Sequence, residues 1–179
     1  MEKGEISMTR LEQLERRVEQ LEQKERVKRA MARVGRWMDR CELTKDTADI
    51  QFLANELMTE QGTVVTMFGT FGPSKVQFVE QFQSFAAKIS WAVHHYYHQE
   101  VDLDLDAGEA HFHALEMVPL QWEEGATWLL LENDSTLHLL GGEWKLHRYS
   151  IDELKTLGNA ETIWHEISRN PKSKMFSDP

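Results

Sequence analysis

The stretch Trp91-Ala-Val-His-His-Tyr-Tyr-His98 runs directly into the alternating segment Val101-Asp-Leu-Asp-Leu105. From residue 93 onward the apolar residues recur at every second position, whereas before it they recur at helical spacing. Turns are predicted at Asp106-Ala-Gly-Glu109 and Gly141-Gly142. Further strands are predicted at 110–120, 126–131, 136–140 and 144–149. The sequence therefore predicts helices first and then a run of antiparallel strands, which is an α+β fold.

The N-terminal half is predicted to be mostly helical, and residues 9–40 carry two apolar stripes. The first stripe has the a and d spacing of a heptad: Leu11, Leu14, Val18 and Leu21. The second is typical of an amphipathic core helix: Val27, Met31, Val34 and Met38. The following elements are a helix at 47–58, a strand at 63–68, a turn at 69–73 and a helix from Ser74 to about Trp91.

Three parts follow from this pattern. Residues 1–26 form an N-terminal helical arm, which is too short to be a strong coiled coil by itself and docks on its own domain or on a neighbouring subunit. Residues 27–150 form the domain, in which a strongly curved antiparallel sheet wraps over the N-terminal helices as a cone-shaped α+β barrel. Such a cone encloses a cavity suited to a small molecule. Residues 151–179 are a tail, weakly helical to about Arg169.

Composition narrows the class of protein. The net charge of −10 disfavours nucleic acid and anionic membranes as partners. The single Cys41 excludes a disulfide within the chain and a thiolate metal cluster. The sequence has no apolar run long enough for a membrane span and no signal-peptide pattern at its start, so we expect a cytoplasmic protein.

The histidine cluster is where we expect chemistry. Histidine has the unperturbed pKa closest to neutrality, so it is the usual proton-transfer group. A metal site of His94 and His98 with His111, His113 or Glu116 is conceivable, but the i, i+4 pair would need a helix and this segment enters a strand. We therefore expect no metal and no cofactor.

Several motifs together resemble the SnoaL-like (polyketide cyclase/dehydratase-type) branch of the nuclear transport factor 2-like superfamily. They are the helix-borne Leu-Glu-Arg-Arg-Val-Glu-Gln-Leu-Glu and Asp39-Arg40, Phe-Gly-Pro-Ser before the third helix, the histidine motif, Asp106-Ala-Gly-Glu-Ala110 and Leu-Gly-Gly-Glu-Trp144-Lys-Leu. The resemblance covers about residues 9 to 150 and is spread over motifs that are each weak.

This resemblance implies a cofactor-free enzyme. Members include scytalone dehydratase, a bile-acid dehydratase, a hexachlorocyclohexane dehydrochlorinase and polyketide cyclases. Several of these lyases use an Asp on the first core helix to orient a His at the start of the strand after the third helix. By motif position the Asp is Asp39 and the His is His94, with His95 and His98 as rivals. Where some dehydratases carry a Tyr, this chain has Val34, for which Tyr96 or Tyr97 would have to substitute.

Further residues are candidates for binding the substrate, and the same residues also suit a core or a strand surface. They are His95, Tyr97, His98, Trp37, Phe68, Trp91, Phe112 and His113. Strand alternation places Phe112 and Glu116 on one face and His111 and His113 on the other, and leaves open which face lines the cavity.

The sequence thus predicts a lyase or isomerase in which Asp39 orients His94 as general base on a small, largely apolar, carbonyl- or hydroxyl-bearing molecule. The alternative is a non-catalytic module of the same fold that binds a small molecule or serves assembly. The convex face of the sheet is expected to be apolar, and with the arm it predicts a homodimer or homotrimer.

Overall fold

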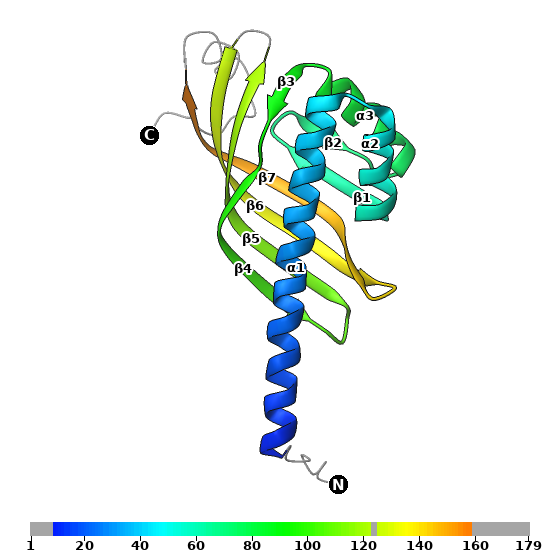
Figure 1. Ribbon diagram of the computed structural model, residues 1–179, viewed down its shortest axis with the longest axis vertical. Helices are drawn as coiled ribbons and strands as arrows, with labels where there is room; N and C mark the ends of the chain where they lie inside the picture. Colours follow the sequence, from blue (N-terminus) through cyan, green and yellow to red (C-terminus); the bar gives the residue numbers. More distant parts are fainter. Residues whose placement is uncertain (1–8, 123–124, 159–179) are drawn as a thin grey trace.

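The computed structural model describes residues 9–122 and 125–158, and a curled sheet packed against helices makes up most of it (Figure 1). The helical elements are α1 (Arg10–Thr44), α2 (Thr47–Phe52), a π-helical turn η1 (Leu53–Leu57) and α3 (Lys75–Ala86). The strands are β1 (Met58–Thr66), β2 (Gly69–Phe71), β3 (Ile89–Ala92), β4 (His95–Asp104), β5 (Glu109–Trp122), β6 (Gly125–Leu140) and β7 (Glu143–Gly158).

The sheet has the strand order β2-β1-β7-β6-β5-β3, and β4 also pairs with β5. All described pairs are antiparallel except β1 with β7, which is parallel, so the sheet is mixed. The long strands β5, β6 and β7 curl around α1, which crosses the concave face (Figure 1). The predicted α+β class and the strongly curved sheet over N-terminal helices are confirmed.

Helix α1 is one uninterrupted helix of 35 residues. It begins at a capping box, in which Thr9 Oγ1 accepts from the backbone N–H of Glu12 and the Glu12 carboxylate accepts from the backbone N–H of Thr9. It ends at Thr44 and is capped by Lys45, whose N–H donates to the carbonyl of Cys41 and whose left-handed backbone turns the chain out of the helix. The second apolar stripe faces the sheet and is buried there, as its spacing predicts: Val27, Met31, Val34 and Met38.

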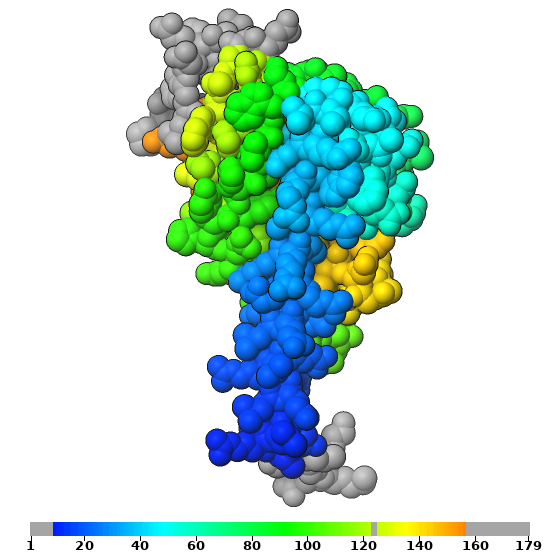
Figure 2. Space-filling model, in the orientation of Figure 1, coloured from blue at the N-terminus to red at the C-terminus, as the bar shows by residue number. Residues whose placement is uncertain are grey.

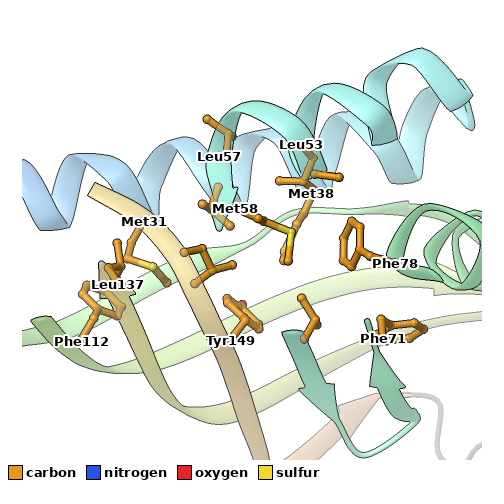
Figure 3. Close-up of a cluster of buried hydrophobic side chains, with 14 of the residues drawn as sticks. Met31, Met38, Leu53, Leu57, Met58, Phe71, Phe78, Phe112, Leu137 and Tyr149 are labelled. Atoms are coloured by element: carbon orange, nitrogen blue, oxygen red, sulfur yellow. The ribbon is translucent and has the colours of Figure 1, made fainter. Parts of the chain in front are cut away.

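The main core fills the cone between α1, η1 and α3 on one side and the sheet on the other. Figure 3 shows Phe112 and Leu137 beside Met31 at one end of this core and Phe71 and Phe78 at the other. Burying one such side chain contributes roughly 1.5–3 kcal/mol, so this cluster is a principal source of stability. A smaller second cluster lies under β3, β5 and β6: Ile89, Ala92, Val118, Leu120, Leu129 and Leu131.

Several predicted boundaries are wrong. The helix expected at 47–58 gives way to the π-helical turn and then to β1, which starts at Met58. The helix expected to reach Trp91 ends at Ala86, because residues 89–92 pair with β5 as strand β3. The strands expected at 126–131 and 136–140 form one continuous β6. The tail from residue 151, which was expected to be helical, belongs to strand β7 as far as residue 158. Residues 159–179 of the tail lie outside the described residues.

The outward face of the sheet is apolar over only part of its area. Its apolar part lies along β5 and β6 toward one end: Leu115, Met117, Pro119, Trp128 and Leu130. Toward the other end it is polar, and His111 and His138 there both lie within 4 Å of the Glu109 carboxylate. The expected apolar convex face is therefore found along only part of β5 and β6. Among the described helices, none is long and apolar enough to cross a membrane.

Candidate active site

His94 lies at a break in the edge of the sheet. β3 and β4 follow the same line along β5, and the pairs Ala92 with Leu120 and His95 with Met117 bracket the break. This register sets Val93 opposite Pro119, whose carbonyl accepts the Val93 N–H but which has no N–H to return. The proline therefore interrupts the ladder beside His94.

The free edge of the strand lets Asp39 of α1 bind His94 twice. Asp39 Oδ1 accepts the backbone N–H of His94 at 2.8 Å and lies 2.6 Å from His94 Nδ1. The His94 side chain is 9% exposed and that of Asp39 23% exposed. Because one carboxylate oxygen receives both groups, the imidazole is fixed with its Nδ1 toward α1 and its Nε2 toward the interior of the cone.

A second carboxylate, Glu116 of β5, lies inside the cone. Glu116 Oε1 is 4.0 Å from His94 Nε2 and accepts the Tyr149 hydroxyl at 2.5 Å. Asn133 Nδ2 donates to Glu116 Oε2 at 2.8 Å, and Ser135 donates to Asn133 Oδ1 at 2.7 Å. All four polar side chains are buried, so the network holds the Glu116 carboxyl group rigidly opposite His94.

The charges around His94 decide its protonation. Burial lowers the pKa of His94, but the hydrogen bond with Asp39 and the nearby carboxylates Glu42 and Glu116 outweigh it and raise the pKa to about 9. Burial also raises the pKa of Glu116. The His94 cation and the hydrogen bonds that Tyr149 and Asn133 donate to Glu116 act in the opposite direction but do not cancel this effect. At neutral pH the folded protein therefore holds His94 as an imidazolium among carboxyl groups.

Tyr96 completes the wall of the site. Its hydroxyl lies 3.4 Å from that of Tyr149, and its ring meets Phe112 edge-on. Burial raises the pKa of Tyr96 well above its usual value, so its hydroxyl keeps its proton. A Cβ at Gly35 of α1 would lie 3.0 Å from the Tyr96 ring and 3.4 Å from His94 Cβ. Glycine at this position thus allows α1 to approach both residues closely.

Glu42 lies one helical turn beyond Asp39 and is buried, and its Oε2 has no hydrogen-bond partner among the described residues. Burial raises the pKa of Glu42 from 4.5 to about 7. Because the folded pKa lies above the unfolded value, ionisation of Glu42 costs stability as the pH rises from about 4.5 through 7.

We expect Glu42→Gln to become more stable relative to the wild type as the pH rises. The difference in unfolding free energy grows by up to about 3 kcal/mol between pH 5 and pH 8, since one pKa unit corresponds to about 1.4 kcal/mol. Urea unfolding of both proteins at the two pH values measures it. The control Glu132→Gln alters an exposed carboxylate on β6 and should show a constant difference. A constant difference for Glu42→Gln as well would contradict the expected burial cost.

Two of the hollows on the surface of the described residues are lined by side chains that could contact a small molecule. One, of about 660 Å³, lies between the β1–β2 turn, α3 and the end of β5, and aromatic side chains line much of it: Phe68, Phe71, Phe85 and Trp122. The other, of about 310 Å³, lies between α1 and the β6–β7 hairpin, and its lining includes Arg26, Arg29, Arg33 and Trp144. Neither is lined by Asp39 or His94.

Solved structures resemble this chain, although no protein-family model and no curated protein matches it. A protein assigned as a scytalone dehydratase from Novosphingobium aromaticivorans matches with a TM-score of 0.62 at 17% identity, over 76% of this chain and 87% of that one. A nuclear transport factor 2-like protein with a cystatin-like fold from the same organism gives 0.61 at 17% identity, over 89% and 97%.

The chain has the nuclear transport factor 2-like fold. A hexachlorocyclohexane dehydrochlorinase, LinA type 2, shares it with a TM-score of 0.59 at 9% identity, over 73% of this chain and 86% of that one. The fold implied by the motifs in residues 9–150 is thus confirmed, while identities this low carry the fold alone.

In this nuclear transport factor 2-like fold the three candidate histidines lie in different environments. His94 and Tyr96 lie toward α1, whereas His95 and Tyr97 alternate with them and are exposed, with ring centroids 6.5 Å apart. His98 is exposed at a β-bulge, where its left-handed backbone shifts the register of β4 against β5. Neither His95 nor His98 therefore replaces His94 beside Asp39.

The other predicted binding residues do not converge on His94. Phe112 is fully buried in the core, and Trp37 stacks on Phe52 at 4.1 Å. Trp91 donates its indole N–H to Gln121, and His113 pairs with Asp134 at 3.5 Å on the outward face. Phe68 lines the larger of the two hollows and the other predicted residues line neither, so the predicted set does not come together around His94.

The sequence analysis did not identify several residues of the site, among them Glu42, Glu116 and Tyr149. Glu42 could have been found, because an i, i+3 spacing places it on the same face of α1 as Asp39. Glu116 alternates with Phe112 and so shares its buried face, which the sequence left open. Within the described residues no group of three His, Cys, Asp or Glu side chains could hold a metal ion.

Proposed function

We propose that the protein is a cofactor-independent enzyme of the lyase or isomerase type that moves a proton on a small, largely apolar substrate with a carbonyl or hydroxyl group. The observation that carries this proposal is the pair formed by Asp39 and His94, whose Oδ1 and Nδ1 lie 2.6 Å apart at the edge of the cone. Two structures with the same fold, those assigned as a scytalone dehydratase and a hexachlorocyclohexane dehydrochlorinase, are named for elimination reactions.

In this mechanism Nε2 of neutral His94 accepts a proton from a carbon atom of the substrate. Asp39 holds the other nitrogen, which fixes the tautomer and stabilises the imidazolium that forms. Tyr96 keeps its proton and faces the same interior, so it can donate to the departing group or to the developing oxyanion. Dehydration, cyclisation and double-bond migration share these steps.

Deuterium exchange tests the proposal directly. A panel of small cyclic and aromatic ketones is incubated with the protein in D2O, and exchange beside the carbonyl is followed by NMR. General-base catalysis contributes about 10²- to 10⁴-fold. Above pH 9, where His94 is neutral both in the wild type and in Asp39→Asn, we therefore expect His94→Gln and Asp39→Asn to lose at least about 10²-fold of the exchange rate. The matched control His95→Gln, on the opposite face of the strand, should exchange like the wild type.

The rate should rise with pH and level off above about 9, because only neutral His94 accepts a proton and its pKa is about 9. Exchange that is unchanged in Asp39→Asn would count against the mechanism.

A second candidate function is ligand binding without chemistry. It is favoured by the larger hollow, which aromatic side chains line and which contains neither Asp39 nor His94. In that case Phe68→Ala should weaken the binding of apolar ketones, as seen by ligand-detected NMR, while Asp39→Asn binds them normally. Neither Phe68→Ala nor Asp39→Asn, nor the wild type, would catalyse deuterium exchange of the ketones.

A further inference from the structure

The N-terminal half of α1 extends away from the body of the domain (Figure 2). Its last hydrogen bonds to the body join Gln23 to Trp144 and Arg26 to the carbonyl of Gly142. Residues 10–22, which precede Gln23 in this helix, are all exposed. We call residues 10–24 the arm helix. The capping box at Thr9 shows that this projecting part begins as an ordered helix.

One face of the arm helix is apolar and open to water. The side chains of its stripe are 53–65% exposed: Leu11, Leu14, Val18 and Leu21. At about 100° per residue, this stripe lies roughly 150° around the helix axis from the stripe that packs on the sheet. The arm stripe therefore points away from its own domain, so docking on that domain would require α1 to bend or twist.

The charges beside the stripe have a strict order. With Leu11 and Val18 at position a, the three g positions are basic: Arg10, Arg17 and Lys24. The two e positions are acidic: Glu15 and Glu22. In the described part of the chain none of these five forms an ion pair.

This order selects one kind of partner. In a parallel coiled coil each g residue faces the next e residue of the other helix, so Arg10 meets Glu15 and Arg17 meets Glu22 of a second copy. In an antiparallel pair g faces g and e faces e, so like charges would meet. Val at one a position and Leu at both d positions, Leu14 and Leu21, suit two strands.

We propose that the arm helix binds the arm helix of a second copy of this chain as a parallel, two-stranded coiled coil. The stripe spans only two heptads, since the next a and d positions are Glu25 and Lys28. A free peptide of this length would be a marginal helix, but here the folded domain has already nucleated α1. The arm helix only extends it, which lowers the cost of association.

Mass in solution tests the interaction with the full-length chain. The wild type should have twice the 20.9 kDa mass of one chain. Leu14→Asp with Val18→Asp should have the mass of one chain. The neighbours Arg16 and Arg17 give a matched pair, because Arg17→Glu changes a g position and Arg16→Glu changes an f position on the opposite side. We expect Arg17→Glu to raise the dissociation constant at least tenfold and Arg16→Glu to leave it within about twofold.

Two further variants test the orientation. Leu14→Cys should form a disulfide between copies on mild oxidation, because identical d positions meet in a parallel pair, while Arg16→Cys should not. The quadruple variant Arg10→Glu/Glu15→Lys/Arg17→Glu/Glu22→Lys exchanges the charges of each g–e pair, so it keeps both attractions and should form the dimer. A monomeric or trimeric wild type, a Leu14→Asp/Val18→Asp protein that keeps the wild-type mass, or no disulfide at Leu14→Cys would overturn the proposal.

Discussion

Asp39→Asn should lower the pKa of His94 by roughly one to three units from about 9, the range over which a close opposite charge shifts a titrating group. The Asn side chain has the same shape and can still accept from the backbone N–H of His94, so the imidazole stays in place. What is lost is the negative charge that opposes the burial of the cation. An NMR titration of the His94 ring protons in both proteins measures the change, and no substrate is needed.

The same substitution changes how stability depends on pH. In the wild type the folded pKa of His94 lies above the ordinary 6.5, so its stabilising contribution is fully present below about 6.5 and is lost as the pH rises through 9. Asp39→Asn should reduce the contribution present below that window. The exposed residue Asp134 gives the control, since Asp134→Asn should leave the His94 titration unchanged. A His94 pKa that stays near 9 in Asp39→Asn would show that the carboxylate does not hold the charge.

Phe112→Ala should lower the unfolding free energy by about 3–5 kcal/mol, the usual cost of truncating a fully buried aromatic side chain. Phe112 has no exposed surface and packs beside Leu137 and Met31 (Figure 3). Its ring and the Tyr96 ring meet in a T-shaped arrangement. The loss combines the transfer of the ring with the cavity that it leaves. Equilibrium unfolding in urea gives the value.

Phe68→Ala is the matched control, because the same chemical change occurs at a ring that is 47% exposed. We expect it to cost less than about 1 kcal/mol, since little apolar surface is returned to water. A loss below about 1 kcal/mol in Phe112→Ala would mean that this ring faces an open cavity and not a packed core.

The parts of the fold that were predicted correctly are segments whose apolar residues follow one spacing throughout, either the helical or the alternating one. Val27, Met31, Val34 and Met38 repeat at helical spacing and pack on the sheet, and the alternation after residue 100 gives β4 and β5. Gly141 and Gly142 form the expected turn, with the positive φ angles that such a turn needs.

The predicted boundaries are wrong where a short segment fits both the helical and the strand spacing of apolar residues. Residues 89–92 continue the apolar spacing of α3, but tertiary pairing with β5 makes them a strand. Residues 132–135 are polar and separate two predicted strands, yet Asn133 and Ser135 point into the cone, where Asn133 donates to Glu116 and Ser135 donates to Asn133. A buried polar network cannot be seen in a hydrophobic pattern, because its partners come from strands far apart in sequence.

Of the candidate site, the sequence predicted the pairing of Asp39 with His94, and it did so through the family resemblance. Asp39 and His94 are 55 positions apart, and no local pattern joins them, so only the resemblance to a known family placed them together. The network behind them required knowledge of which face of β5 is buried. Alternation divides the residues of a strand into two faces but does not say which face is inside.

The continuity of α1 has a consequence for anyone who cuts or extends this chain. The arm helix and Asp39 belong to one helix without a break, so the rotational phase of the arm is locked to that of the carboxylate. Each residue inserted between them would advance the arm by about 1.5 Å and turn it by about 100°. A fused domain or label at the N-terminus can therefore be aimed around the axis in steps by adding residues, whereas an addition of seven, close to two full turns, returns it almost to its original direction.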